Sequence, residues 1–156
     1  MKTIPLSRGK FALVDDEDYE YLNQWKWHIS HYGYAERTQH MPSSRANQKF
    51  KSIRMHRLIM DAPKNLQVDH IDGSRTNNVR SNLRLCLSGE NTRNQKVRAT
   101  SRSGYKGVSW HPGARKWMVR VGTRYFGLHD DAGEAAKVYN HWAVVLFGEF
   151  ARLNDV

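Results

Sequence analysis

The feature that most restricts the fold of this chain is how short its apolar runs are. The longest run, Trp142 to Phe147, has six residues, whereas a membrane-spanning helix needs about 20. Of the 156 residues, 39% are apolar and 11% aromatic, enough for small cores and too aromatic for a disordered chain. The sequence therefore predicts one ordinary domain or two very small ones, built from short elements and without a membrane span.

The beginning of the chain and its cysteine content bear on its compartment. The first five residues, Met1 to Pro5, contain no apolar signal-peptide stretch. The single cysteine, Cys86, excludes an internal disulfide framework and a cysteine-based zinc site. We therefore expect a cytoplasmic protein.

Positive charge is concentrated in the middle third of the chain. The net charge is +10, and residues 51–102 hold eleven basic residues, eight of them Arg, against four acidic ones. Such a balance favours a polyanion partner, nucleic acid before a membrane surface, and arginine suits phosphate. The acid-free stretch from Thr92 to Ser103 could follow a phosphate backbone or be an ordinary solvated linker.

Short strands and helices are expected along residues 1–95. Alternating or β-prone segments predict strands over 11–14, 25–29, 34–37, 52–55, 66–71 and 83–87. Short helices are expected after the acidic cluster 15–18, over 56–60, and from Ser88, a good N-cap. Residues 38–51 are polar and irregular, which predicts a loop.

The C-terminal third predicts three strands followed by one helix. The strands are expected over 107–110, 117–121 and 125–128, and the helix begins at the capping-box-like Asp131-x-x-Glu134 and ends before Gly148. An apolar stripe at helical spacing predicts that this helix covers one face of the sheet. Because side chains alternate along residues 117–121, Trp117 and Arg120 should point to opposite faces of the sheet, and either face could be the inner one. The whole chain thus predicts an α+β fold.

One group of polar residues could perform chemistry on a phosphodiester. Asp69 and His70 end an apolar strand, and Asn82 and Asn91 follow at intervals. A carboxylate and an amide oxygen, Asp69 and Asn91, suit a hard divalent cation with positions left open for substrate. His70 could activate water, and Asn82 could fix the loop that carries it. The alternatives are a structural histidine and asparagines in turns and caps.

At these residues the sequence resembles the phage-type HNH homing endonucleases, which are ββα-metal nucleases. The resemblance covers about residues 50–95, and residues 1–50 look like the β-rich leader that often precedes this unit. The matching segments are Met55-His56-Arg57, Val68-Asp69-His70-Ile71-Asp72-Gly73, Asn77-Asn78, Arg80-Ser81-Asn82-Leu83-Arg84 and Glu90-Asn91-Thr92-Arg93-Asn94.

The HNH resemblance implies a role for each residue of the group. His70 corresponds to the general base, Asp69 and Asn91 to the ligands of one Mg²⁺ or Mn²⁺ per active site, and Asn82 to the residue that fixes the loop. An asparagine rather than a histidine at the third position of the motif favours a magnesium-type oxygen site over zinc. His56 would assist at the phosphate or be structural.

A second resemblance, to the AP2/ERF DNA-binding domain, covers Ser103 to Asn154. It rests on Gly104-Tyr105-Lys106-Gly107-Val108, Lys116-Trp117, Tyr125-Phe126-Gly127, Glu134-Ala135-Ala136, Tyr139, Ala143 and Gly148 through Asn154. In that family the sheet lies in the major groove, which implies a reading face made of Lys106, Ser109, His111, Lys116, Trp117, Arg120 and Arg124. Ser109 and His111 replace an arginine of the family's first strand, so no base preference carries over.

The leading interpretation is a metal-dependent endonuclease that cuts double-stranded DNA and is targeted by a C-terminal sequence-reading module. We expect an HNH domain with its leader over 1–95, a basic linker over 96–103 and an AP2/ERF-like domain over 104–156. Phosphate contacts are expected from Arg54, Arg57, Arg75, Arg80, Arg84, Arg93, Lys96, Arg98 and Arg102.

The biological setting implied by the resemblance is a phage or mobile-element enzyme of the homing type. It would act in the cytoplasm of a bacterial host, most simply as a monomer and without a membrane partner. The main alternative is a non-catalytic DNA-binding transcriptional regulator with an idle HNH fold. A basic RNA-binding or ribosome-associated protein is a third reading, although the sequence shows no aromatic single-strand platform.

Overall fold

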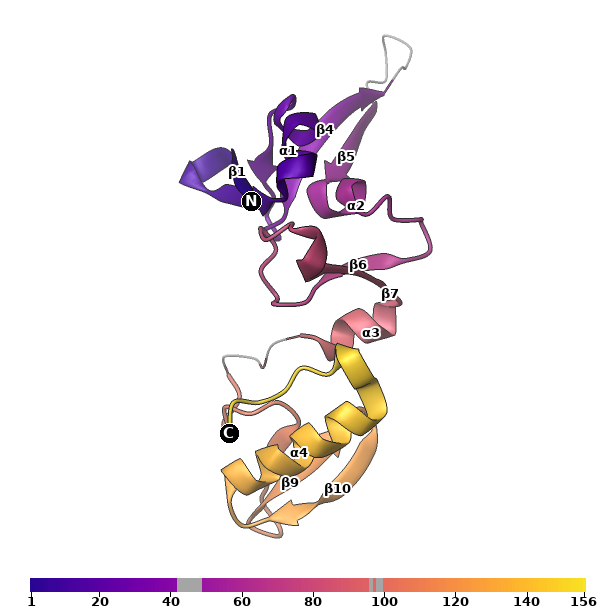
Figure 1. Ribbon diagram of the computed structural model, residues 1–156. Helices are drawn as coiled ribbons and strands as arrows, with labels where there is room; N and C mark the ends of the chain where they lie inside the picture. The colour runs from indigo at the N-terminus through magenta and orange to yellow at the C-terminus, as the bar shows by residue number, and fades with distance from the viewer. Residues whose placement is uncertain (42–48, 96, 98–99) are drawn as a thin grey trace. The chain divides into compact units, whose positions relative to one another are not determined.

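The computed structural model describes residues 1–41, 49–95, 97 and 100–156 (Figure 1). It confirms the α+β class, with 30% of the residues in helices and 32% in strands. The chain forms two compact units, Met1–Ser88 and Gly89–Val156, and the division falls before the end expected at residue 95. Among the described helices, none has the length and apolar character needed to cross a membrane.

The N-terminal unit contains three small antiparallel sheets and short helices. The leader supplies β1 (Lys2–Pro5) with β2 (Phe11–Val14), and then β3 (His28–Ile29), β4 (Ala35–Met41) and β5 (Lys49–Arg54) in that order. The third sheet pairs β6 (Gln67–His70) with β7 (Leu83–Cys86). The helices are η1 (Ser7–Gly9), α1 (Asp16–Asn23), α2 (Met55–Ile59), η2 (Arg80–Asn82) and, across the division, α3 (Ser88–Arg93).

One hydrophobic core joins the leader to the β6–β7 sheet. Ile4 and Leu22 from the leader are buried in the same cluster as Met55 of α2, Val68 of β6 and Leu83 of β7. Burial of these side chains supplies the main favourable term for folding. The leader is therefore part of the domain that carries Asp69 and His70.

Three leader segments differ from the prediction. Strand β1 was not expected, although β2 requires a partner for its backbone groups. Residues 25–27 are not a strand, because the backbone N–H of Trp25 and the indole of Trp27 both donate to the carbonyl of Leu22 at the end of α1. The loop prediction over 38–51 is wrong at both ends, where β4 and β5 pair, and residues 42–48 lie outside the described chain.

The C-terminal unit confirms the predicted three-stranded sheet with one helix packed on it. Strands β8 (Val108–His111), β9 (Lys116–Val121) and β10 (Arg124–His129) are antiparallel in the order β10-β9-β8, and α4 (Ala132–Phe147) precedes η3 (Gly148–Phe150). The side chain of Asp131 accepts from the backbone N–H of Glu134 at 2.9 Å, as a helix cap does. The core between sheet and helix consists of Val108, Val119, Val121, Ala135, Ala136, Tyr139 and Ala143.

Gly107 is required where β8 begins. Its φ is +73°, and an added Cβ would collide with the ring of Tyr139 and lie 2.6 Å from the backbone oxygen of Arg120. The backbone N–H of Arg120 also donates to the carbonyl of Gly107 at 2.8 Å. Only glycine permits this close approach of β8 to the buried tyrosine.

Candidate active site

Asp69 and His70 lie at the buried end of β6. They pair in register with Arg84 and Leu83 of β7, and both residues are only 5% exposed. Successive residues of a strand point to opposite faces. The sheet therefore separates the carboxylate from the imidazole while holding both in fixed positions.

The His70 imidazole is held as a neutral base. Its Nε2 lies 3.2 Å from Oδ1 of Asn78, a completely buried side chain. An amide oxygen only accepts, so Nε2 donates and Nδ1 keeps the lone pair. Burial lowers the pKa of His70, although the Asn78 bond and the nearby Asp72 and Asp69 oppose that shift. At neutral pH, His70 is thus ready to accept a proton.

An aromatic cluster surrounds His70 with residues that sequence reasoning did not assign to the site. The ring of His56, on α2, lies 5.0 Å from that of His70 and 5.0 Å from that of Tyr34. His56 is 3% exposed, and burial, with His70, Arg54 and Arg57, lowers its pKa to about 3. In the described structure its buried Nδ1 lacks a hydrogen-bond partner, which is rare for a buried polar atom.

The proposed metal ligand Asp69 forms a buried ion pair with Arg84. Oδ2 of Asp69 accepts from Nε of Arg84 at 3.0 Å and from Nη2 at 2.8 Å. Arg84 was expected to contact phosphate, but this structure directs it to Asp69 instead. The two hydrogen bonds fix the orientation of the carboxylate.

The loop between β6 and β7 is tied together by Asn82. Its side chain accepts from the backbone N–H of Asp72 at 3.0 Å, and its Nδ2 donates to Oδ1 of Asp72 and to the carbonyl of Asn77 at 3.0 and 2.9 Å. Burial alone would raise the pKa of Asp72, but hydrogen bonds from Asn77, Ser74 and Asn82 outweigh it and lower that pKa. Asp72 is the centre of this network, and the sequence reasoning missed it.

Strand β2 of the leader forms backbone hydrogen bonds with the same loop. The backbone N–H of Leu13 donates to the carbonyl of Thr76 at 2.9 Å, and that of Asn78 donates to the carbonyl of Leu13 at 2.8 Å. Strand β2 therefore fixes the backbone of Asn78, whose side chain holds His70. This long-range contact leaves no local signal in the sequence.

Two further arginines expected at phosphates are engaged within the protein. Arg57 donates to the carbonyls of residues 62, 63 and 66, at 2.9 to 3.0 Å. Arg80 pairs with Asp18 at 2.7 Å and with Glu17 at 3.0 Å, which gives the acidic cluster of the leader a structural role. Arg54 and Arg75 are exposed and lie beside Tyr34.

Asn91 lies on α3, within the C-terminal compact unit. Its pairing with Asp69 at a metal ion therefore stays a prediction. Over the described ranges, no group of three or more His, Cys, Asp or Glu side chains is placed to hold a metal. The predicted donors, one carboxylate and one amide oxygen, nevertheless suit Mg²⁺ or Mn²⁺ by their chemistry.

The outer face of the C-terminal sheet carries part of the expected DNA-reading set. Ser109, His111 and Arg120 are exposed, and Lys116 is half-buried and paired with Asp130 at 3.1 Å. Trp117 belongs to the other face, because it packs on the core with Val119 and contacts Trp110 at 5.1 Å between ring centroids. The placement of Trp117 on a reading face is therefore corrected. Arg124, another residue of the expected set, is exposed at the start of β10.

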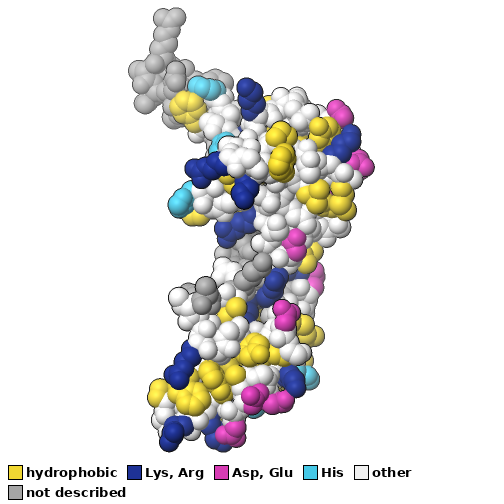
Figure 2. Space-filling model, turned by 90° about the vertical axis from the view of Figure 1, so that its left-hand side faces the viewer, with side chains coloured by type: hydrophobic (Ala, Val, Ile, Leu, Met, Phe, Trp, Pro, Cys, Tyr) yellow, Lys and Arg dark blue, Asp and Glu magenta, His cyan; other side chains and the backbone are white. Residues whose placement is uncertain are grey.

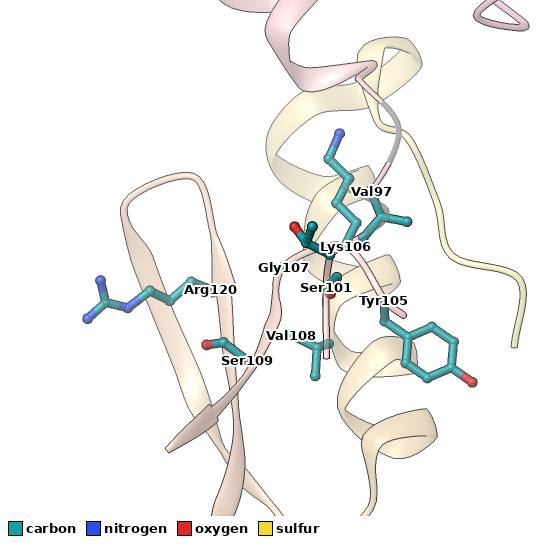
Figure 3. A pocket seen from close by; sticks show the side chains of 9 residues that line it. Val97, Ser101, Tyr105, Lys106, Gly107, Val108, Ser109 and Arg120 are labelled. Carbon is teal, nitrogen blue, oxygen red and sulfur yellow. The ribbon is translucent and has the colours of Figure 1, made fainter. Parts of the chain in front are cut away.

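Lys106 also departs from the reading face. Its ammonium group donates to the carbonyls of Arg93 and Gln95, at the end of α3, and burial lowers its pKa to about 8, with Arg152 contributing. Figure 3 shows Lys106 and Arg120 pointing in different directions from a pocket of about 370 Å³. The pocket therefore does not direct two cations onto one anion.

The expected cations of the linker region are only partly described. Arg93 lies over the ring of Phe147 at 4.8 Å, and Arg102 over that of Trp110 at 5.3 Å. Lys96 and Arg98 lie outside the described residues. Lysine and arginine side chains are exposed on both units on the face drawn in Figure 2.

Comparison with known proteins identifies the family. The HNH endonuclease family model matches residues 61–93, a span that contains Asp69, His70, Asn82 and Asn91. The uncharacterized HNH endonuclease L560 of Acanthamoeba polyphaga mimivirus is 31% identical over an alignment 166 residues long. The alignment covers 97% of this chain and 79% of that protein. The chain therefore belongs to the HNH endonuclease family. The protein is a DNA endonuclease.

A phage protein is also similar over a shorter stretch. Protein 3.8 of Escherichia phage T7 is 39% identical over 79 residues, covering 47% of this chain and 65% of that protein. No solved structure matches the chain.

Proposed function

We propose that this endonuclease hydrolyses phosphodiester bonds of double-stranded DNA with His70 as its general base. The observation that carries the proposal is the buried, neutral imidazole held by Asn78. With Nε2 donating to Asn78, the lone pair on Nδ1 takes a proton from the attacking water. Asn82 keeps the loop around His70 in place through Asp72 and Asn77.

Asp69 and Asn91 would hold one divalent ion, Mg²⁺ or Mn²⁺. When bound, such an ion polarises the scissile phosphate and stabilises charge on the leaving oxygen. Arg84 holds the carboxylate of Asp69 in place through the contacts at 2.8 and 3.0 Å. A supporting residue of this kind commonly orients a metal-binding carboxylate.

The C-terminal unit is proposed to be an AP2/ERF-like module that binds the major groove. Support comes from its sheet-and-helix architecture and from the exposed outer-face residues Ser109, His111 and Arg120, while Arg124 is exposed at the start of β10. The viral and phage relatives support a mobile-element or phage enzyme of the homing type, acting in the host cytoplasm. A monomer with one such site would nick one strand at a time.

Plasmid cleavage tests the proposal. Supercoiled plasmid is incubated with the full chain and Mg²⁺, and then with a chelator. We expect metal-dependent nicking, reduced roughly 10²- to 10⁴-fold in His70→Ala with DNA binding retained, while His31→Ala, at an exposed position, leaves it unchanged. Binding without strand scission under any divalent ion would favour the non-catalytic regulator.

A further inference from the structure

Two arginine side chains lie near the ring of Tyr34. The guanidinium carbon of Arg54 is 5.2 Å from the ring centroid, and that of Arg75 is 4.9 Å from it. Tyr34 directly precedes β4, Arg54 ends β5, and Arg75 lies in the loop after β6. Three separate segments thus bring two cations to one aromatic ring.

In the described structure, these two arginines make fewer hydrogen bonds and ion pairs with the protein than the other arginines near the site. Arg57, Arg80 and Arg84 are each held by protein carbonyls or carboxylates. Arg75 donates to the carbonyl of Tyr32 at 2.5 Å, and in the described part of the chain it forms no ion pair.

Arg54 is only loosely paired. Its one ion pair within the described ranges is with Glu36, at 3.7 Å. Both Arg54 and Arg75 are exposed. Two exposed guanidinium groups that share a ring repel each other, and an anion between or beside them relieves that repulsion.

The same ring also contacts the candidate catalytic histidine. The centroid of Tyr34 is 5.9 Å from that of His70 and 5.0 Å from that of His56. A phosphate gripped by Arg54 and Arg75 would therefore lie beside the proposed base. Guanidinium groups suit this task because their N–H groups fit phosphate oxygens.

We propose that Tyr34 is a positioning residue that presents Arg54 and Arg75 to a backbone phosphate of DNA beside His70. This inference rests on the proposed function and assigns Tyr34 of the leader, which lies outside residues 61–93 of the family match, an indirect part in substrate binding. The tyrosine acts through its ring face, which holds the guanidinium groups by cation–π attraction.

The test is the salt dependence of DNA binding, measured with the full chain in chelator so that no strand is cut. Each phosphate contact contributes about 0.9 to the slope of log affinity against log salt concentration. We expect the slope to fall by about one in Arg54→Gln and in Arg75→Gln. Tyr34→Leu should lower it by about one to two although it removes no charge, with an affinity loss of roughly tenfold at low salt.

Matched variants separate positioning from folding. Tyr34→Phe keeps the ring and should retain the wild-type slope, and Tyr21→Leu, at an exposed tyrosine of the same unit, should leave it unchanged. A structural defect alone lowers the melting temperature but does not change the number of phosphates neutralised. In the Arg54→Gln, Arg75→Gln background, Tyr34→Leu should have no further effect on the slope.

The outcomes decide the two proposals separately. A wild-type slope in folded Tyr34→Leu overturns the positioning role, even if the protein cleaves plasmid. Should Tyr34→Leu fail to fold, the arginine variants decide, and unchanged slopes in both overturn the inference. Salt-dependent binding that responds to Tyr34 without metal-dependent cleavage would instead overturn the proposed nuclease mechanism and leave the phosphate grip standing.

Discussion

Acid is expected to destabilise the N-terminal unit because His56 is buried in its neutral form. Burial lowers the pKa of His56 to about 3, whereas an imidazole in an unfolded chain has a pKa of about 6.5. Only the unfolded state then binds a proton between these two values. The stability that neutral His56 contributes is complete above about pH 6.5 and is lost as the pH falls towards about 3.

The size of this effect follows from the difference between the two pKa values. From about pH 7.5 to about pH 5, the unfolded state gains about 2 kcal/mol relative to the folded state, since one pKa unit corresponds to about 1.4 kcal/mol. A change of about 1 kcal/mol shifts the melting temperature of a unit this small by roughly 4–8 °C. We therefore expect His56 to lower the melting temperature by about 10 °C over this interval.

Denaturant unfolding of wild type and His56→Leu at the two pH values measures this contribution. The leucine is close to histidine in volume and does not titrate, so the pH-dependent loss should shrink by about 2 kcal/mol in the variant. His31→Leu, at an exposed position, should behave like wild type. His70 is present in every protein, so its own share largely cancels. Equal losses in wild type and His56→Leu would refute the buried neutral state.

Three further outcomes are expected. Because burial lowers the pKa of His70, the cleavage rate should stay constant as the pH falls through about 6.5 and decline only below it, as a pH–rate profile will show. Asp18→Ala should lower the free energy of unfolding by roughly 2 kcal/mol, since Asp18 is buried and paired with Arg80; denaturant titration measures this. Gly107→Ala should cost the C-terminal unit about 3 kcal/mol or more in thermal melts, because Tyr139 occupies the space.

Local patterns predicted the elements that are stabilised locally. The cap at Asp131, the apolar stripe of α4 and Gly148 lie within one continuous segment, and the helix begins and ends where they indicate. Strand β2 and the ββ pair of the HNH unit were likewise readable from short alternating or β-prone runs. Trp25 to Trp27 alternates as well, but hydrogen bonds to the carbonyl of Leu22 at the end of α1 override that preference.

The surroundings of the candidate site could not be predicted because they depend on distant segments. Tyr34, His56 and His70 meet only after β4, α2 and β6 have packed together. Similarly, a count of arginines does not reveal that Arg80 is held by carboxylates more than sixty residues earlier in the chain. The motif predicts where the chemistry takes place, whereas the folded contacts determine which cations remain accessible to a substrate.

The contacts at the end of α3 bear on how such modules are exchanged. Lys106 caps the last carbonyls of this helix, and Arg93 stacks on Phe147. A chimera joined within the basic stretch after residue 95 would give α3 a foreign partner at its C-terminal end. A fusion joined before Ser88 would transfer the whole helix together with the residues that support its end, but it would also separate the proposed metal ligand Asn91 from Asp69.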